Sequence, residues 1–189
     1  TFQEFWDRAL FNGVVSEATV AAPVSAVGQV DAAAAEVAKT YTAANAGAEL
    51  VLYTKVGIGS GAFANNPWLQ EMADPITKAT WDNYLTVSKK WASENGVAMV
   101  EENTKKAKLT VNGKSILVPI LVQPGQAYGT FGLALGYGRT KAGRVADGVG
   151  VNAFDLVDTS KGFVNFDLTT KVEVVATEET YKIARTQTH

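Results

Sequence analysis

The segment from residue 122 to residue 152, VQPGQAYGTFGLALGYGRTKAGRVADGVGVN, constrains the fold of this chain more than any other part. It holds eight of the seventeen glycines, at positions 125, 129, 132, 136, 138, 143, 148 and 150. Glycine loses more conformational entropy on folding than other residues, so this clustering is costly unless the backbone needs positive φ or a close approach. The segment therefore predicts either tight turns and barrel corners or a loop that faces a ligand.

The glycines do not form a common phosphate-binding motif. A Walker loop requires GxxxxGK[ST], but Gly143 is followed by Arg144 and Val145. A dinucleotide fingerprint requires GxGxxG between a strand and a helix, and neither GIGSG at 57–61 nor GYG at 136–138 continues in that way. Enzymes built on either motif are therefore poor candidates.

Composition removes several further classes of function. The 189 residues include no cysteine and a single histidine, His189, which excludes thiolate catalysis, cysteine-ligated metals and an internal Ser-His-Asp triad. The acidic pairs at 101–102 and 178–179 are typical of solvated surface, so no metal site is predicted. A formal net charge of −2 without a basic cluster argues against nucleic acid as a partner. No apolar run approaches the roughly twenty residues that cross a bilayer, so direct membrane insertion is not expected.

The hydrophobic patterning predicts a mainly β domain with a few short helices. Helices are expected at residues 1–12 with Gly13 as the stop, at 31–43 with Asp31 as the cap, at 89–95, and as a turn at 67–72. Strands are expected at 50–56, 80–88, 107–112, 115–123, 131–137, 162–166 and 171–179. Asn112-Gly113 separates two of them and is a strong two-residue hairpin signal. Many short strands with glycine-rich corners favour a closed barrel.

Polar candidates gather around the sequence NNPWLQE at 65–71 and TWDNY at 80–84. Asn66 precedes Pro67 and can cap the short helix that the proline begins. Alternatively, Asn65, Asn66 and Asn83 form a polar pocket wall, because side-chain amides donate and accept hydrogen bonds to a purine or pterin ring. Both interpretations remain open from the sequence.

Three stretches carry a resemblance to a known family: VLYTKVGIGSG, then NNPWLQEMADPITKATWDNYLTVS, then VPILVQPGQAYGTFGLALGYGR. Over residues 49 to 155 the chain resembles the C-terminal domain of the molybdopterin oxidoreductase superfamily. With LALGYGRTKAGRVADGVGVNAF, it is similar more narrowly to the large subunit of alternative complex III, the Tat-variant-translocated molybdopterin oxidoreductase. The region WASENGVAMVEENTKKAKLTV departs from the superfamily, because it has Gly96 but no Asp-Gly turn.

The resemblance implies a double-psi β-barrel like domain 4 of the formate dehydrogenase and DMSO reductase type. It implies the tail of a preceding domain and an Ala-rich connection at 1–48, the barrel at 49–180, and at 181–189 the start of a linker to a missing iron–sulfur domain. The chain is then a piece of a periplasmic subunit, held at the inner membrane through partner subunits of a quinol-oxidising complex. Its partners are the other domains of its polypeptide and those subunits.

Two functions follow from this resemblance. In the first, the domain is part of an oxidoreductase but is itself structural, with no catalytic residue and no cofactor, and the iron–sulfur clusters lie elsewhere. In the second, it binds the guanine dinucleotide tail of a molybdopterin cofactor. Arginine offers a planar fork of donors to a pyrophosphate. The candidate cofactor-binding residues, some of them vestigial, are Asn65, Asn66, Asn83, Tyr137, Arg139, Arg144 and Asn152. A free-standing enzyme acting through Ser60 or Tyr137 lacks a general base.

Overall fold

A computed structural model describes residues 1–15, 30–42, 47–98, 103–159, 164–168 and 171–186 of the chain. The chain divides into two compact units, Thr1–Lys39 and Thr40–His189. The first unit contains two helices, and the second contains all the strands and the candidate residues. Within the described residues, no helix is both long and apolar enough to cross a membrane.

The first unit contains α1 (Phe2–Asn12) and all but the last three residues of α2 (Val30–Thr42). A capping box of Thr1 and Glu4 begins α1, and Gly13 ends it at a φ of 69°. None of the side chains of α1 is buried within the structure. The prediction that Asp31 caps α2 is wrong, because the helix begins one residue earlier and Asp31 lies in its first turn. An acidic residue there still interacts favourably with the helix dipole.

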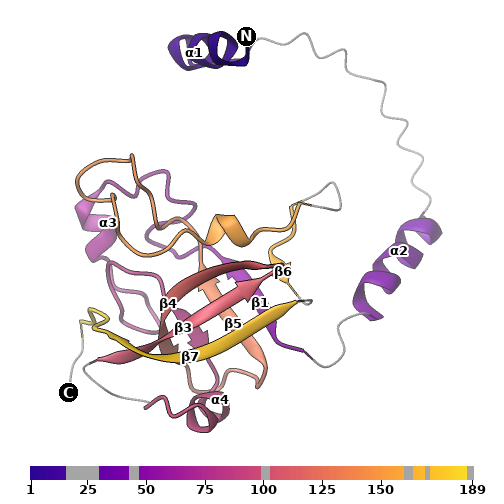
Figure 1. The fold of residues 1–189 in the computed structure, drawn as a ribbon, viewed down its shortest axis with the longest axis vertical. Coiled ribbons are helices and arrows are strands. Elements are labelled where there is room, and N and C mark those ends of the chain that lie inside the picture. The colour runs from indigo at the N-terminus through magenta and orange to yellow at the C-terminus, as the bar shows by residue number, and fades with distance from the viewer. Residues whose placement is uncertain (16–29, 43–46, 99–102, 160–163, 169–170, 187–189) are drawn as a thin grey trace. The chain divides into compact units, whose positions relative to one another are not determined.

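The second unit is mainly β, as predicted, and is built on a seven-stranded mixed sheet (Figure 1). Its order across the sheet is β6-β1-β5-β2-β4-β3-β7. The strands are β1 (Glu49–Tyr53), β2 (Leu85–Val87), β3 (Thr104–Val111), β4 (Lys114–Val122), β5 (Thr130–Ala134), β6 (Asp167–Leu168) and β7 (Val172–Tyr181).

The hairpin between β3 and β4 confirms the strongest local prediction. Val111 pairs with Lys114 across the turn, and the two residues between them, Asn112 and Gly113, have φ angles of 50° and 83°. Positive φ at both central positions is what a type I′ turn requires. The sequence therefore determined this turn and the register of the β3–β4 pair.

Two parallel pairings join segments that are distant in the chain. Strand β1 runs parallel to β5, with Leu50 opposite Phe131, and β2 runs parallel to β4, with Leu85 opposite Ile120. An antiparallel pairing of β2 with β5 links the two. Parallel neighbours need long crossover connections. The irregular stretch from 54 to 84 joins β1 to β2 and is the first part of the crossover from β1 to β5. It carries three of the seven candidate residues, Asn65, Asn66 and Asn83.

The main core is formed by buried side chains of the sheet strands and of the segments that pack against the sheet. Leu50, Leu85, Leu109, Ile120 and Leu133 are fully buried in it. Apolar residues two apart on a strand point to the same face, which is why Leu50 and Leu52 of β1 both enter the core while Val51 between them is exposed. Trp91 meets Phe131 edge to face at a centroid distance of 5.5 Å. Helix α4 (Lys89–Glu94) is therefore held by an aromatic contact.

Three of the predicted strands are shorter than expected. Strand β1 ends at Tyr53 and β5 at Ala134, before the glycine-rich turns that follow each. Of the predicted strand 80–88 only Leu85–Val87 is extended and paired, because Trp81 has a φ of 65°, which breaks the strand geometry. The predicted strand 162–166 lies partly outside the described residues, and β6 follows it at Asp167–Leu168.

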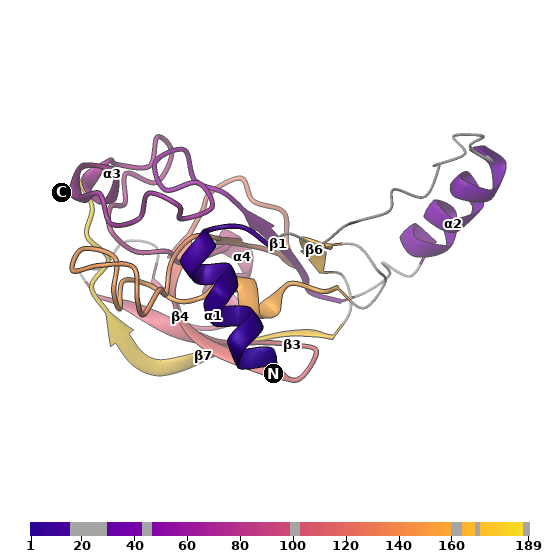
Figure 2. The ribbon, with the colours of Figure 1, turned by 90° about the horizontal axis from the view of Figure 1, so that it is seen from above.

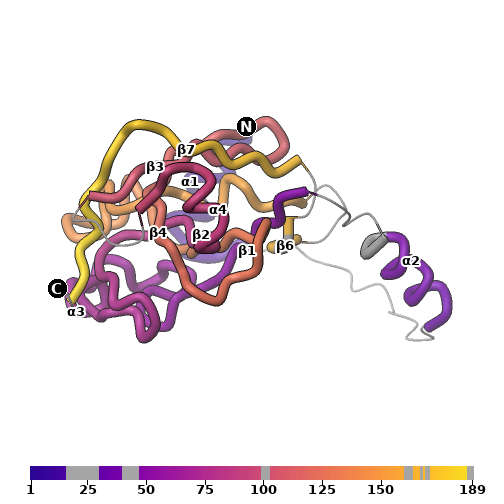
Figure 3. The backbone as a smooth tube through the Cα atoms, turned by 90° about the horizontal axis from the view of Figure 1, so that it is seen from below, coloured from indigo at the N-terminus to yellow at the C-terminus, as the bar shows by residue number. Residues whose placement is uncertain are grey.

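The segment after β7, which Figures 2 and 3 show in yellow leaving the end of that strand, pairs with the loop that follows α3 (Pro67–Glu71). Backbone hydrogen bonds join Thr80 to Ala184 at 2.9 Å and Thr186 to Lys78 at 3.0 Å. The Arg185 guanidinium donates twice to the Thr77 carbonyl, at 3.2 Å each. This segment therefore closes one side of the stretch between β1 and β2, which contains Asn65, Asn66 and Asn83.

Candidate functional site

The glycine-rich segment makes a close backbone contact with the 57–61 turn. A Cβ at Gly136 would lie 2.8 Å from both the Gly59 oxygen and the Gly61 nitrogen, and the φ of Gly136 is 94°. Only glycine avoids both the steric overlap and the backbone strain there. At Gly136, the structure therefore supports the interpretation of the glycines as tight corners.

The amides of Asn65 and Asn66 are used within the fold. The Asn65 Oδ1 accepts from the Val145 backbone N–H at 3.0 Å and so holds the glycine-rich loop against the start of α3. The Asn66 Oδ1 accepts from the Trp68 N–H at 3.0 Å and caps α3. The capping interpretation of Asn66 is confirmed. Both side chains are otherwise exposed to solvent.

Asn83 is fully buried and ties three backbone groups together. Its Nδ2 donates to the carbonyls of Ala134 at 2.8 Å and Val151 at 2.9 Å. Its Oδ1 accepts from the Val151 N–H at 2.9 Å. With both donors and one acceptor site occupied and no solvent exposure, this amide has no face left for a base or a pterin ring.

Asn152, Tyr137 and Arg139 line one open hollow of about 670 Å³ in the glycine-rich loop. The other lining residues are Gly136, Gly138, Thr140, Lys141, Ala142 and Phe154. Asn152 also accepts from the Phe154 N–H at 3.1 Å and caps a short 3₁₀ helix, η1 (Ala153–Leu156). One Arg139 nitrogen donates to the Ser60 carbonyl at 3.3 Å, while its buried Nε has no hydrogen-bond partner.

The structure therefore brings together three of the seven candidate residues and separates the rest. Asn65, Asn66, Asn83 and Arg144 do not line this hollow, and Arg144 is exposed. A dinucleotide tail needs base-reading amides and phosphate-binding cations around one space. The amides here hold backbone instead, so the seven residues do not fit a molybdopterin dinucleotide as one set.

A second, buried polar cluster surrounds Lys55, a residue that we did not predict from the sequence. Lys55 is only 8% exposed, and its Nζ donates to the Asp82 carbonyl at 2.9 Å. The same nitrogen lies 4.1 Å from the centroid of the Tyr84 ring and 5.3 Å from that of Tyr137. Cation–π contacts of this kind partly replace the lost hydration of an ammonium group.

The carboxylates near Lys55 are held by other partners. The Asp74 Oδ1 accepts from the Ile76 N–H and from the Thr77 N–H and hydroxyl, at 2.8 to 3.1 Å. The Asp82 Oδ2 accepts from the Tyr181 hydroxyl at 2.7 Å. Within the described residues, neither carboxylate makes an ion pair with Lys55. Lys55 is therefore a buried cation without a direct counter-ion.

Burial, hydrogen bonds and nearby charges shift the pKa values of the groups in this cluster. Burial lowers the pKa of Lys55 to about 8, and the more distant negative charges of Asp74 and Asp82 only partly offset it. Burial also raises the pKa of Asp82, against the hydrogen bond from Tyr181. Burial tends to raise the pKa of Asp74, but the hydrogen bonds from Thr77 and Ile76 together hold it below its usual value. The pKa values of Tyr84 and Tyr137 are raised, chiefly by burial, so both phenols stay protonated.

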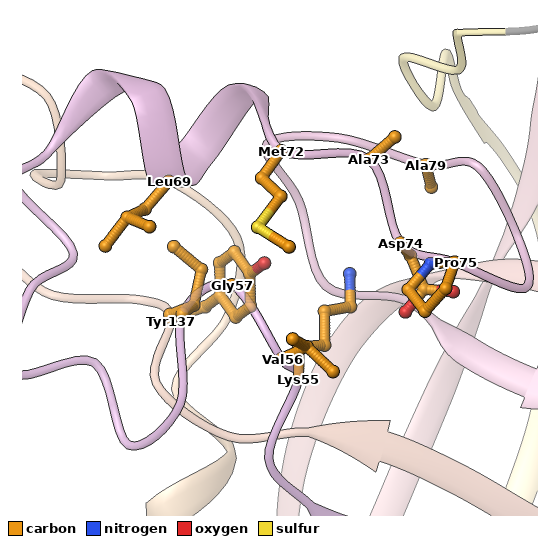
Figure 4. Close-up of a pocket in the computed structure, with 11 residues that line it drawn as sticks. Lys55, Val56, Gly57, Leu69, Met72, Ala73, Asp74, Pro75, Ala79 and Tyr137 are labelled. Atoms are coloured by element: carbon orange, nitrogen blue, oxygen red, sulfur yellow. The ribbon is translucent and has the colours of Figure 1, made fainter.

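Lys55 lines a small pocket at the base of α3, shown in Figure 4. The hollow measures about 280 Å³ in all, and its interior has room for about one water molecule. Asp74, Tyr137, Leu69 and Met72 also line it, together with Val56, Gly57, Ile58, Ala73, Pro75 and Ala79. The sequence carries little signal of this site, because a lysine just after a strand is usually solvated.

No family model matches the chain, and no curated protein sequence matches it. Within the described residues, no group of three or more histidine, aspartate or glutamate side chains is placed to hold a metal ion. The functional interpretation therefore depends on the geometry of this chain and on the resemblance that its motifs carry.

Proposed function

We propose that this chain is a molybdopterin-dinucleotide-binding-like domain that has a structural role in a periplasmic respiratory oxidoreductase subunit. It is the double-psi β-barrel domain of that subunit, similar to the large subunit of alternative complex III. Its task is to pack against the other domains of its polypeptide within a quinol-oxidising membrane complex. Catalysis and the iron–sulfur clusters belong to other parts of the assembly.

The strand pairing supports the double-psi barrel. The parallel pairs β1–β5 and β2–β4 are each made by a crossover, and β2 also pairs with β5. Strand β1, the first strand of the unit, thus pairs with β5, which comes much later in the chain and has glycine-rich turns before and after it. Closing such a sheet would remove exposed strand edges, which favours a barrel over an open sheet.

The observation that carries the structural role is the way the amides are used. Asn83 makes three buried backbone hydrogen bonds, and Asn65, Asn66 and Asn152 each accept one from a backbone N–H. An amide that holds the backbone of its own fold stabilises that fold at a net of about 1 kcal/mol per hydrogen bond. The amides that were candidates for binding a cofactor therefore serve here as internal supports of the stretch between β1 and β2 and of the glycine-rich loop.

One observation favours the alternative, a module that binds the guanine dinucleotide tail. Arg139, Lys141 and Asn152 line one open hollow beside Gly136 and Gly138, and the Arg139 Nε lacks a partner. A guanidinium with free donors next to glycine backbone is suited to an anionic group. This geometry accommodates part of a nucleotide, without the base-reading amides.

Titration calorimetry of the 189-residue chain with GDP tests the two functions. The structural role predicts no saturable heat up to millimolar GDP. Saturable binding that Arg139→Ala abolishes and Arg144→Ala retains would establish the cofactor module instead. Arg144 is the matched control, because it is an exposed arginine in the same loop that does not line the hollow.

A second experiment tests the assembly role in the parent subunit. Asn83→Ala should lower the amount of assembled membrane complex, since it removes the buried supports of two loops. Quinol oxidation per assembled complex should not change in Arg139→Ala. Loss of turnover in fully assembled Arg139→Ala complex would contradict a purely structural role.

A further inference from the structure

We propose that Lys55 is a carbonyl-reactive amine and that the pocket at the base of α3 admits a small aldehyde, which condenses with Nζ to form an imine. This inference is independent of the proposed structural role. It depends on the confined geometry around Lys55, on the missing counter-ion, and on the size of the pocket.

The geometry favours the neutral amine over the ammonium ion. The side chain is 8% exposed, and only one hydrogen bond, to the Asp82 carbonyl, is formed by Nζ among the described residues. The charged and titratable groups that face it are Asp74, Asp82, Tyr84 and Tyr137. Neither carboxylate pairs with it directly, so burial dominates and its pKa falls to about 8. Lysines desolvated in this way are typical Schiff-base nucleophiles.

The pocket limits the size of the electrophile. Its interior has room for about one water molecule, so the smallest aldehyde, with a single carbon, is the one that comes nearest to this size. Leu69 and Met72 supply apolar walls, and Met72 is 47% exposed at the rim. Methionine is flexible, so this rim can adjust slightly, but a ring-sized aldehyde would collide with the walls.

The reaction balances without any additional component. The Nζ lone pair attacks the carbonyl carbon, and both amine hydrogens leave with the carbonyl oxygen as water. The C=N bond replaces the C=O bond, and nothing is oxidised or reduced. The product is a neutral imine, so the reaction relieves the cost of burying an ammonium group. An added hydride donor then converts the imine to methyl-lysine and records the event.

The test is reductive methylation of the full chain with formaldehyde and cyanoborohydride at pH 7.5, followed by peptide mapping. At that pH roughly a quarter of an amine with a pKa of 8 is neutral, against about one in 800 for an ordinary lysine. A weaker base is a poorer nucleophile, which we take to offset roughly tenfold of this advantage. We therefore expect Lys55 to be methylated about tenfold faster than Lys89 and Lys90, which are exposed internal references in the same digest.

Two further measurements on the same chain, which need no substitution, test whether the preference for Lys55 depends on the folded structure and on the size of the aldehyde. In guanidinium chloride the preference for Lys55 should disappear, because it arises from the tertiary structure. With benzaldehyde in place of formaldehyde the preference should also disappear, because the ring is too large for the pocket. A Lys55 rate at or below that of the exposed lysines with formaldehyde, or an equal preference for both aldehydes, would overturn the proposal.

Discussion

The buried amine of Lys55 should make the stability of this protein rise with pH across a defined window. Its pKa in the folded state is about 8, against 10.5 for the free side chain. Below pH 8 both states are protonated, and the folded state bears a cost of about 3 kcal/mol for the buried charge. As the pH rises from 8 towards 10.5 the folded protein releases this proton while the unfolded chain retains it, so this cost is progressively relieved.

Comparison with Lys55→Met isolates this effect, because methionine keeps an unbranched side chain in the pocket but cannot titrate. Unfolding in urea, followed by tryptophan fluorescence at several pH values, gives the free energy of unfolding of both proteins. Integrated from pH 7 to pH 9.5, the proton difference makes wild type gain about 2 kcal/mol over the variant. The tyrosines of the cluster do not disturb this window, since their folded-state pKa values are raised and their titration in the unfolded chain is common to both proteins.

A constant difference in unfolding free energy between the two proteins from pH 7 to pH 9.5 would contradict a lowered pKa of Lys55. It would mean that water or the carboxylates restore the ordinary pKa of Lys55. A gain of the opposite sign would mean that Asp74 and Asp82 outweigh burial. An NMR titration of the Lys55 Nζ would then locate the pKa directly.

Three further predictions concern single contacts, each measured as a change in the urea unfolding free energy. Asn83→Ala should destabilise by about 3 kcal/mol, because it removes three buried hydrogen bonds; a loss below about 1 kcal/mol would show that the amide is dispensable. Gly136→Ala should cost more than Gly125→Ala, because both glycines have positive φ but only the first faces backbone at 2.8 Å, and equal losses would argue against the close contact. Tyr181→Phe should cost about 1 to 2 kcal/mol by removing the hydroxyl donor of the buried Asp82 carboxylate, whereas Tyr128→Phe, which removes an exposed hydroxyl contact to Glu94, should be nearly neutral.

Where a local pattern determined the structure, the sequence predicted it closely. The four helical segments lie within one or two residues of their expected bounds, because caps and stops such as Gly13 and Asn66 act within a few residues. Apart from the expected cap at Asp31, the clearest failure occurred where a long-range contact competed with the local pattern. Trp81 lies in a segment that alternates like a strand, yet its N–H donates to the Gln70 carbonyl at 2.8 Å and its backbone leaves the extended region.

The candidate site shows the same difference between features set by local sequence and features set by long-range contacts. The residue types around 65–83 and 136–152 stand out in the sequence, and the capping role of Asn66 is one of the two interpretations that the sequence leaves open. The sequence could not tell whether Asn83 reads a ligand or holds backbone, because its partners lie 51 and 68 residues away. It also left Lys55 unnoticed, since a lysine at the end of a strand has the same local pattern whether it is solvated or buried.

The amino-acid sequence alone is enough to predict the mainly β character, the short helices, the hairpin at Asn112-Gly113 and the exclusion of cysteine chemistry. These depend on composition, periodicity and the φ preferences of neighbouring residues. Only the tertiary structure decided which amides hold the backbone, which three candidates share a hollow, and that Lys55 is enclosed by Tyr84, Tyr137 and the Asp82 carbonyl. Burial and hydrogen bonding of a side chain depend on which distant segments the crossovers bring beside it, and that arrangement is set by packing of the whole sheet.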